Sequence, residues 1–220
     1  MNYMILLAGG IGSRTGLKIP KQYHKINDEY IINYLLNKIH KELDKIILVI
    51  DFQYKDKITN FNNVIFCKNG QTRLESLQNG FKEIQKIASS DDLIFIHEAA
   101  RIMLDKKDIN LHKQNATKNC GLISCNIVYD TMFKINSKNE IVEVIKKQNI
   151  MAGYNPQSFF WSDLEKYKED ILNATNDLDL SDILIKKKFK IKILNQISDL
   201  RKITIQKDIE WAEKNLKWKK

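Results

Sequence analysis

The chain has 220 residues, of which 43% are hydrophobic and 9% aromatic, and it carries a formal net charge of +9. This length suits one domain with a sizeable core, and no apolar run approaches the ~20 residues of a membrane span. The charge suggests an anionic partner, such as nucleic acid, a phosphorylated metabolite or a membrane surface, but lysine runs near the C-terminus are also typical of a solvated face.

The cysteines and the N-terminal residues indicate in which cellular compartment we expect the protein. Three cysteines, at positions 67, 120 and 125, are an odd number without CxxC spacing, so we expect reduced thiols rather than a metal site or disulfides. The start, MNYMILLAGG, has no basic region before its short apolar run, which predicts a first strand rather than a signal peptide. The expected location is cytoplasmic.

Short apolar runs alternate with helix-like patterns along the chain. The expected strands are 3–7, 45–50, 64–67, 93–97, 121–126 and 191–194. The expected helices are 31–40, 72–86, 107–117, 161–173 and 207–216. This alternation predicts an α/β fold with a mostly parallel, Rossmann-like sheet and helices on both faces. Ligands of such sheets bind at the carboxyl ends of the strands.

The segment 130–150 breaks this alternation. TMFKIN and EIVEVIKK alternate apolar and polar residues around the turn NSKN, which predicts a β-hairpin. With only two prolines and no visible linker or repeat, we interpret 1–220 as a single domain. The hairpin is then an arm within it, which we expect to make a homodimer.

The segment after the first expected strand, LLAGGIGSRTGLKIPKQY at 6–23, is rich in glycine and basic residues. Backbone N–H groups of such a loop can approach an anion closely, and Arg14 and Lys21 add charge that suits a triphosphate. It is not a Walker A loop, because leucine follows Gly16. It is not a dinucleotide fingerprint, because Thr15 replaces the third glycine and Pro20 stops a helix. An ordinary glycine-rich turn is the alternative.

Six segments, in order along the chain, resemble those of a known family. They are LAGGxGxR with PKQY, NGQTRLESLQNG (69–80), IHEAAR (96–101), YDTM (129–132), YNPQSFF (154–160), and SDLRKIT (198–204) with KDIEWAE. Together they resemble the cytidylyltransferases of polyol phosphates, whose members make CDP-methylerythritol for isoprenoids or CDP-ribitol for teichoic acid and capsule. The resemblance spans nearly the whole chain and implies a nucleotidyltransferase-type sheet.

The resemblance implies that an alcohol phosphate attacks the α-phosphorus of CTP and releases pyrophosphate. Such a transfer depends on positioning and on neutralising negative charge, for which lysine, arginine and Mg²⁺ are suited. The implied catalytic residues are Arg14, Lys21 and Lys202. The implied nucleotide-binding residues are Leu7, Ala8, Gly9, Gly10, Gly12, Gly70, Arg73 and Ser76.

The resemblance also implies a metal site and an acceptor site. Glu98 ends an expected strand where the family has aspartate, and with Asp199 it is expected to bind Mg²⁺. Its longer side chain displaces the carboxylate by ~1.5 Å, and Mg²⁺ tolerates little geometric error, so either the site has adjusted or the ligand lies elsewhere. The neighbouring His97 is expected to be structural. The implied acceptor-binding residues are Arg101, Thr131, Lys147 and Asn155.

The acceptor side departs from the family pattern. Lys147 replaces an arginine that the family supplies across its dimer, and lysine lacks the bidentate fork that fits a phosphate. Asn155 replaces a threonine, and Ile102 replaces a proline. We therefore predict an acceptor like ribitol 5-phosphate, giving a CDP-polyol for surface polysaccharide. 2-C-methyl-D-erythritol 4-phosphate cytidylyltransferase of isoprenoid biosynthesis is the alternative.

Two other classes remain open. A nucleotidyltransferase for another base is disfavoured by the cytidine-like GQTRLES segment. A non-catalytic protein that binds nucleotides or nucleic acid is disfavoured by the retained Arg14, Lys21 and Lys202. The predicted partners are therefore CTP, a polyol or sugar phosphate and a second copy of the chain, with no nucleic acid and no membrane.

Overall fold

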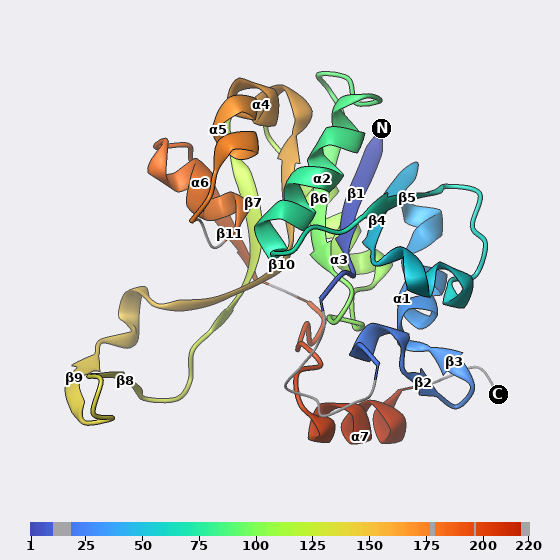
Figure 1. The fold of residues 1–220 in the computed structure, drawn as a ribbon. Helices are drawn as coiled ribbons and strands as arrows, with labels where there is room; N and C mark the ends of the chain where they lie inside the picture. The colour runs from blue at the N-terminus through green and yellow to red at the C-terminus, as the bar shows by residue number, and fades with distance from the viewer. Residues whose placement is uncertain (11–18, 177–178, 196, 217–220) are drawn as a thin grey trace.

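A computed structural model describes residues 1–10, 19–176, 179–195 and 197–216. Its centre is a seven-stranded sheet in the order β11-β7-β10-β6-β1-β4-β5 (Figure 1). The strands are β1 (Asn2–Leu7), β4 (Lys45–Ile50), β5 (Val64–Lys68), β6 (Leu93–Glu98), β7 (Gly121–Ile127), β10 (Met151–Phe160) and β11 (Ile191–Asn195). Only β10 among them runs antiparallel to its neighbours, β6 and β7. The predicted mostly parallel α/β sheet is confirmed.

Helices cover both faces of this sheet (Figure 1). The helices of the described chain are α1 (Ile31–Ile39), α2 (Arg73–Gln85), α3 (Lys106–Asn115), α4 (Trp161–Lys166), α5 (Lys168–Asn173), α6 (Leu180–Lys186) and α7 (Gln206–Asn215). Of these, α7 lies below the sheet (Figure 1) and belongs to a separate small core with Ile26 and Ile31. Shorter elements are β2 (Lys25–Ile26), β3 (Glu29–Tyr30) and the 3-10 turns Lys21–Tyr23, His40–Glu42, Phe52–Lys57 and Lys147–Asn149. The expected helix 161–173 is two short helices, α4 and α5. None of the described helices is both long and apolar enough to cross a bilayer.

Strand β1 shows why its sequence is an unbroken apolar run. Tyr3 and Ile5 belong to the core under α2 and α4–α6, whereas Met4 and Leu6 belong to the core under α1 and α3. A parallel strand that is buried on both faces needs apolar residues at every position rather than at alternate ones. The two cores together bury both faces of β1, which lies between β6 and β4 in the interior of the sheet.

Strand β10 was not expected from the sequence. Its segment, MAGYNPQSFF, contains a glycine and Pro156, which disfavour a central strand. The strand accommodates them because its pairing with β7 shifts register between Gly153 and Gln157. This irregularity surrounds Pro156, whose missing N–H cannot join the ladder of hydrogen bonds. The result is an antiparallel strand that lies between β7 and β6.

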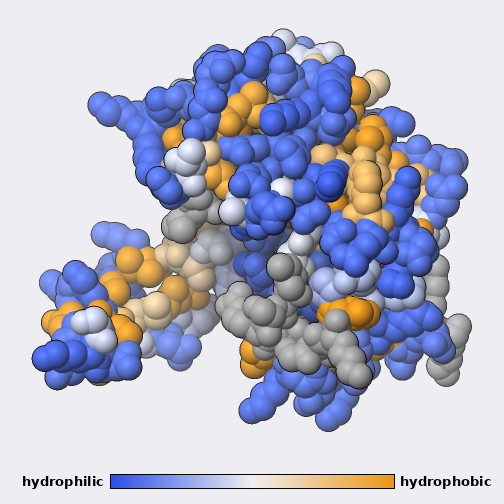
Figure 2. Space-filling model, viewed as in Figure 1, coloured by the Kyte–Doolittle hydropathy of each residue, from blue (hydrophilic) through white to orange (hydrophobic). Residues whose placement is uncertain are grey.

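The predicted hairpin is present as an arm that projects away from the sheet (Figure 1). It consists of β8 (Met132–Ile135) and β9 (Ile141–Ile145), which pair antiparallel with each other. Figure 2 shows apolar side chains gathered on this arm. The exposed ones include Met132, Phe133, Ile135, Ile141, Val142 and Val144. Exposed apolar clusters of this kind mark interaction surfaces.

A buried histidine joins α3 to the sheet. His112 is fully buried, with Nδ1 2.7 Å from Ser158 Oγ on β10 and Nε2 2.9 Å from Ser124 Oγ on β7. Burial, with a small contribution from His97, lowers the pKa of His112 to about 4. The ring is therefore neutral at pH 7, and the serine hydroxyls can serve both of its nitrogens.

This histidine makes stability depend on pH. The pKa of His112 is lower in the folded chain than the ~6.5 of an unfolded chain, so acidification from pH 6.5 toward 4 favours unfolding. We expect the free energy of unfolding to fall in that window by up to about 1.4 kcal/mol per pH unit for each such histidine. The measurement is urea denaturation of the wild type and of His112→Gln at pH 7 and pH 5. The variant should show a shallower dependence, and equal slopes would contradict the assignment.

Candidate active site

The strand order places a ligand site beside β1. After β1, the chain places β4 and then β5 on one side of β1, and β6 then pairs with the other side of β1. The carboxyl ends of β1 and β6 lie together, with Leu7 opposite Glu98 in the parallel register. In open α/β sheets, this reversal of strand order opens a crevice at the carboxyl ends, where ligands bind. The glycine-rich segment and Glu98, both singled out from the sequence, thus meet at this point.

Side chains of the PKQY motif form hydrogen bonds with the backbone at the start of the glycine-rich segment. Gln22 Nε2 donates to the carbonyl oxygens of Ala8 at 2.6 Å and Gly10 at 2.8 Å, and Tyr23 OH donates to that of Ala8 at 2.9 Å. The chain that leaves β1 is therefore tied to the chain that returns to the core. Lys21 lies next to these contacts and is only 8% exposed. The other predicted loop residues, Gly12 and Arg14, lie outside the described residues.

The second predicted nucleotide segment packs directly against this loop. A Cβ added to Gly9 would lie 2.4 Å from Asn69 Cβ, and one added to Gly70 would lie 2.2 Å from Glu75 Cβ, so both positions need glycine. The Gly70 N–H donates to Ser76 Oγ at 3.1 Å. The structure thus brings together Leu7 to Gly10 and Gly70 to Ser76, which the sequence places more than fifty residues apart.

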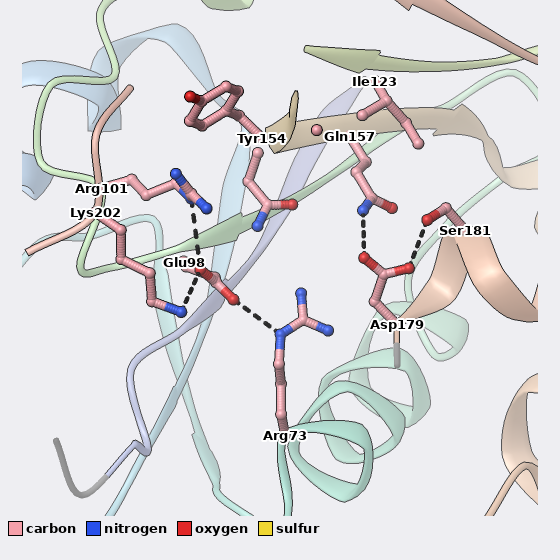
Figure 3. Close-up of a pocket in the computed structure, with 11 residues that line it drawn as sticks. Arg73, Glu98, Arg101, Ile123, Tyr154, Gln157, Asp179, Ser181 and Lys202 are labelled. Carbon is pink, nitrogen blue, oxygen red and sulfur yellow. Dashed lines mark hydrogen bonds and ion pairs between the residues drawn. The ribbon is translucent and has the colours of Figure 1, made fainter. Parts of the chain in front are cut away.

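Glu98 lies at the centre of a cluster of cations (Figure 3). Its Oε1 is 2.8 Å from Arg73 Nε, and its Oε2 is 2.9 Å from Lys202 Nζ and 3.5 Å from Arg101 Nε. These three residues come from α2, the turn after β6 and the segment before α7. One carboxylate therefore joins its own turn to two distant parts of the chain, one of which carries the predicted catalytic residue Lys202.

The cations keep this carboxylate ionised. Burial raises the pKa of Glu98, but Lys202 and Arg73 outweigh burial and hold that pKa at about 2. His97, which precedes it, is fully buried and has its pKa lowered to about 4 mainly by burial. A neutral His97 Nε2–H can donate to the Arg101 carbonyl oxygen 3.0 Å away, which suits the structural role expected for it.

The expected metal pair does not fit Mg²⁺ as the residues lie. Both oxygens of Glu98 face cations, and Asp199 is engaged by Arg201, whose Nε and Nη2 both lie 2.6 Å from Asp199 Oδ2. Across the described ranges, no cluster of three histidine, cysteine, aspartate or glutamate residues is placed to hold a metal. The physical reason is charge: the carboxylate donors that Mg²⁺ prefers are already neutralised by nearby lysine and arginine.

A cavity of about 310 Å³ opens beside Glu98. Its lining includes the predicted residues Arg73, Arg101, Asn155 and Lys202, and also Tyr154, Gln157, Asp179 and Ser181, which the sequence analysis did not select. The Arg101 guanidinium also lies over the Tyr154 ring, 5.0 Å from its centroid. Gln157 belongs to the YNPQSFF segment, whereas Asp179 and Ser181 lie outside all six segments. Their proximity depends on the unexpected strand β10.

Two predicted acceptor residues lie elsewhere in this chain. Thr131 precedes β8 and Lys147 follows β9, so both belong to the exposed arm, and neither lines the cavity. Lys147 Nζ donates to the Tyr129 carbonyl oxygen at 2.7 Å. The structure therefore separates the predicted acceptor residues into a pair in the cavity, Arg101 and Asn155, and a pair on the arm.

Comparison with known proteins decides the family. The model of the family "IspD: 2-C-methyl-D-erythritol 4-phosphate cytidylyltransferase" matches residues 3–217. The chain belongs to this family. A cytidylyltransferase is a nucleotidyltransferase enzyme, so the predicted enzyme class is also established.

Individual relatives bear two different names. A 2-C-methyl-D-erythritol 4-phosphate cytidylyltransferase of Petrotoga mobilis is 29% identical, over 97% of each chain. A ribitol-5-phosphate cytidylyltransferase of Streptococcus agalactiae is 24% identical, over 84% of this chain and 82% of its own. The crystal structure of the Francisella tularensis 2-C-methyl-D-erythritol 4-phosphate cytidylyltransferase has a TM-score of 0.80 and 27% identity, covering 98% of this chain and 99% of its own.

The environment of Glu98 in this cytidylyltransferase gives a test of its role. Glu98→Gln removes the charge that three cations share, so we expect the free energy of unfolding to fall by about 2 kcal/mol. Sulfate should restore more stability to this variant than to the wild type, because a bound anion can replace the carboxylate. The measurement is urea denaturation in sulfate and in chloride at matched ionic strength. Glu98→Asp, which keeps the charge, is the control and should lose less.

A metal-binding role would give a different result. If Glu98 holds Mg²⁺, then Glu98→Gln should raise the Mg²⁺ concentration needed for half-maximal activity at fixed CTP. A counter-ion role predicts that this concentration stays within about twofold of the wild type.

Proposed function

We propose that this enzyme transfers CMP from CTP to a phosphorylated polyol or sugar and releases pyrophosphate. The observation that carries the proposal is the cationic cluster around Glu98, which lines a cavity at the carboxyl ends of the strands, beside the glycine-rich loop. Phosphoryl transfer requires charge neutralisation and positioning rather than a covalent partner. Partly buried cations next to a glycine-rich segment supply both.

Two acceptors fit this proposal for different reasons. Ribitol 5-phosphate is favoured by the departures at Lys147 and Asn155, and it would give a CDP-polyol for surface polysaccharide. 2-C-methyl-D-erythritol 4-phosphate is favoured by the family model and by the names of relatives such as the one from Petrotoga mobilis. Both carry a phosphate and several hydroxyl groups, and CTP is the common nucleotide. We further propose that Mg²⁺ arrives with CTP as part of that substrate.

Each group of residues has a defined part in this proposal. Lys21, with Arg14, would neutralise the triphosphate at the glycine-rich loop. Lys202 and Arg101 would neutralise the acceptor phosphate from the opposite side of the site. The backbone of Gly9 and Gly10 would approach the nucleotide closely, since neither position carries a side chain. The three free and buried cysteines fit the reducing cytoplasm that we propose as the location.

The arm supports a proposed homodimer. Its exposed apolar side chains have no cover within the described chain, and a second copy would bury them. Thr131 and Lys147 would then be brought to the partner's cavity, which would complete the acceptor site. No membrane or nucleic acid is needed to explain this surface or the cationic cavity.

The first test of the proposal is a turnover assay. We expect Mg²⁺-dependent release of pyrophosphate from CTP with ribitol 5-phosphate or 2-C-methyl-D-erythritol 4-phosphate, and little release with ATP. Lys21→Ala should lower kcat by about a hundredfold or more, since it removes a charge that stabilises the transition state. Lys82→Ala, an exposed lysine of α2, is the matched control and should retain activity. Release with neither acceptor would contradict the proposed reaction.

The dimer is tested by charging the arm. Phe133 and Val144 lie opposite each other on β8 and β9, so Phe133→Asp with Val144→Asp puts repulsive charges on the proposed interface. We expect the wild type to sediment as a dimer and the double variant as a monomer, with acceptor turnover reduced at least tenfold. Ile185→Asp, at an exposed apolar residue of α6, is the control and should stay dimeric. A monomeric wild type would overturn the proposal.

A further inference from the structure

The segment that carries Lys202 has no regular secondary structure of its own. Residues 199–204, which lie between β11 and α7, belong to neither a helix nor a strand. No ladder of backbone hydrogen bonds within the segment therefore fixes Lys202. Its Nζ nevertheless lies 2.9 Å from Glu98 Oε2 in the cavity (Figure 3). Contacts with other parts of the fold must hold this segment in place.

Two of these contacts come from the turn after β6. Arg101 Nη1 donates to the Leu200 carbonyl oxygen at 2.7 Å, and the Ile203 N–H donates to the Ala100 carbonyl oxygen at 2.8 Å. The two bonds lie on either side of Lys202 in the sequence. One of them depends on Arg101, which also pairs with the central carboxylate and lines the cavity, so a bound anion competes for the same guanidinium.

A third contact comes from α3, away from the cavity. Asp108 Oδ1 accepts from the Ser198 N–H at 3.1 Å, and its Oδ2 accepts from the Asp105 N–H at 3.1 Å. The second bond closes the capping box at the start of α3, so the helix itself fixes the carboxylate. Asp108 is only 2% exposed and is not among the residues that line the cavity. A buried side chain thus holds the segment from outside the site.

The path of the chain shows why this contact matters. Strand β11 lies at the edge of the sheet, and β7 and β10 separate it from β6. The chain crosses this distance before it reaches the turn after β6, and α3 holds it at Ser198 during the crossing. Leu200 is then fully buried in the core that also contains Ile109 of α3. A displacement of about 1 Å of a catalytic group can cost about a hundredfold in rate, so a small shift at Ser198 matters at Lys202.

We propose that Asp108 is a positioning residue for Lys202. By accepting from the Ser198 N–H, it fixes the path of the segment that brings the Lys202 ammonium to Glu98. Its effect on turnover rests on the proposed function, whereas its effect on the position of Lys202 does not. Asp108 touches no reacting atom and acts only through Lys202.

The first test is amide hydrogen exchange measured by mass spectrometry. Asp108→Ala leaves the Ser198 N–H without its acceptor, so we expect exchange in a peptide that covers residues 198–203 to accelerate at least tenfold. Asp105→Ala is the matched control. It breaks the same capping box but keeps the contact with Ser198, so exchange should rise at the start of α3 in both variants and at 198–203 in Asp108→Ala alone.

The position of Lys202 is followed directly by competitive acetylation without substrates. The exposed Lys82 of α2 is the internal reference. Loss of the ion pair with Glu98 frees the Lys202 amine, so its rate of acetylation relative to Lys82 should rise at least threefold in Asp108→Ala and stay unchanged in Asp105→Ala.

Turnover then shows whether Asp108 acts through Lys202. With the acceptor that the wild type uses, Asp108→Ala should lower kcat/KM for the acceptor at least tenfold and leave KM for CTP within twofold. In a Lys202→Ala background, the same change should have less than a twofold effect, because the group that it positions is already gone. A residue that only stabilises the fold would lower activity by the same factor in both backgrounds.

Several results would overturn the positioning role. They are a Ser198 amide that exchanges in the wild type as fast as in a free peptide, unchanged acetylation of Lys202 in Asp108→Ala, and equal losses of turnover in both backgrounds. If Asp108→Ala does not fold, Asp108→Leu fills the same space without an acceptor and is measured in its place. Faster exchange and acetylation in an enzyme that releases no pyrophosphate from CTP would support the positioning of Lys202 and overturn the proposed transfer.

Discussion

The buried carboxylate of Glu98 is the interaction on which the site depends. Arg73, Arg101 and Lys202 repel one another, and each comes from a different part of the fold. The shared anion offsets this repulsion where they line one cavity. Their attraction in turn keeps Glu98 ionised, although burial alone would raise its pKa. The cost of burying one charge is thus offset by three partners, and a concentrated positive surface remains for a phosphate.

The sheet makes this convergence possible. Leu7 and Glu98 end neighbouring parallel strands, so the glycine-rich loop and the cationic cluster open on the same edge of the sheet. Hydrogen bonds from Gln22 and Tyr23 to the Ala8 carbonyl oxygen hold the two ends of that loop together. The parts of the site that we propose for the nucleotide and for the acceptor are therefore positioned by one sheet edge.

The sequence predicted the parallel strands and the hairpin well, because strands buried on both faces and alternating hairpins have distinct apolar patterns. It failed at β10, where Pro156 and Gly153 obscure a strand that tolerates them through a register shift. For the candidate site, the sequence identifies residues that stand in motifs but not the contacts between them. Gly70, Ser76, Arg101 and Lys202 stand in recognisable motifs, but the ion pairs of Glu98 and Asp199 depend on which basic residues fold toward them. No local pattern encodes such long-range choices.

The strand that the sequence did not predict, β10, also lines the cavity. The register shift in β10 lies beside Gln157, whose amide contacts Asp179 at the start of α6, and the same cavity is lined by the cations Arg73, Arg101 and Lys202. Strand β10 and the start of α6 therefore add a neutral and an acidic side chain to a cavity that is otherwise basic. A purely basic cavity would bind any anion of suitable size. A cavity with separated charge favours a molecule whose own charge is at one end, as in the sugar or polyol monophosphate that we propose as acceptor.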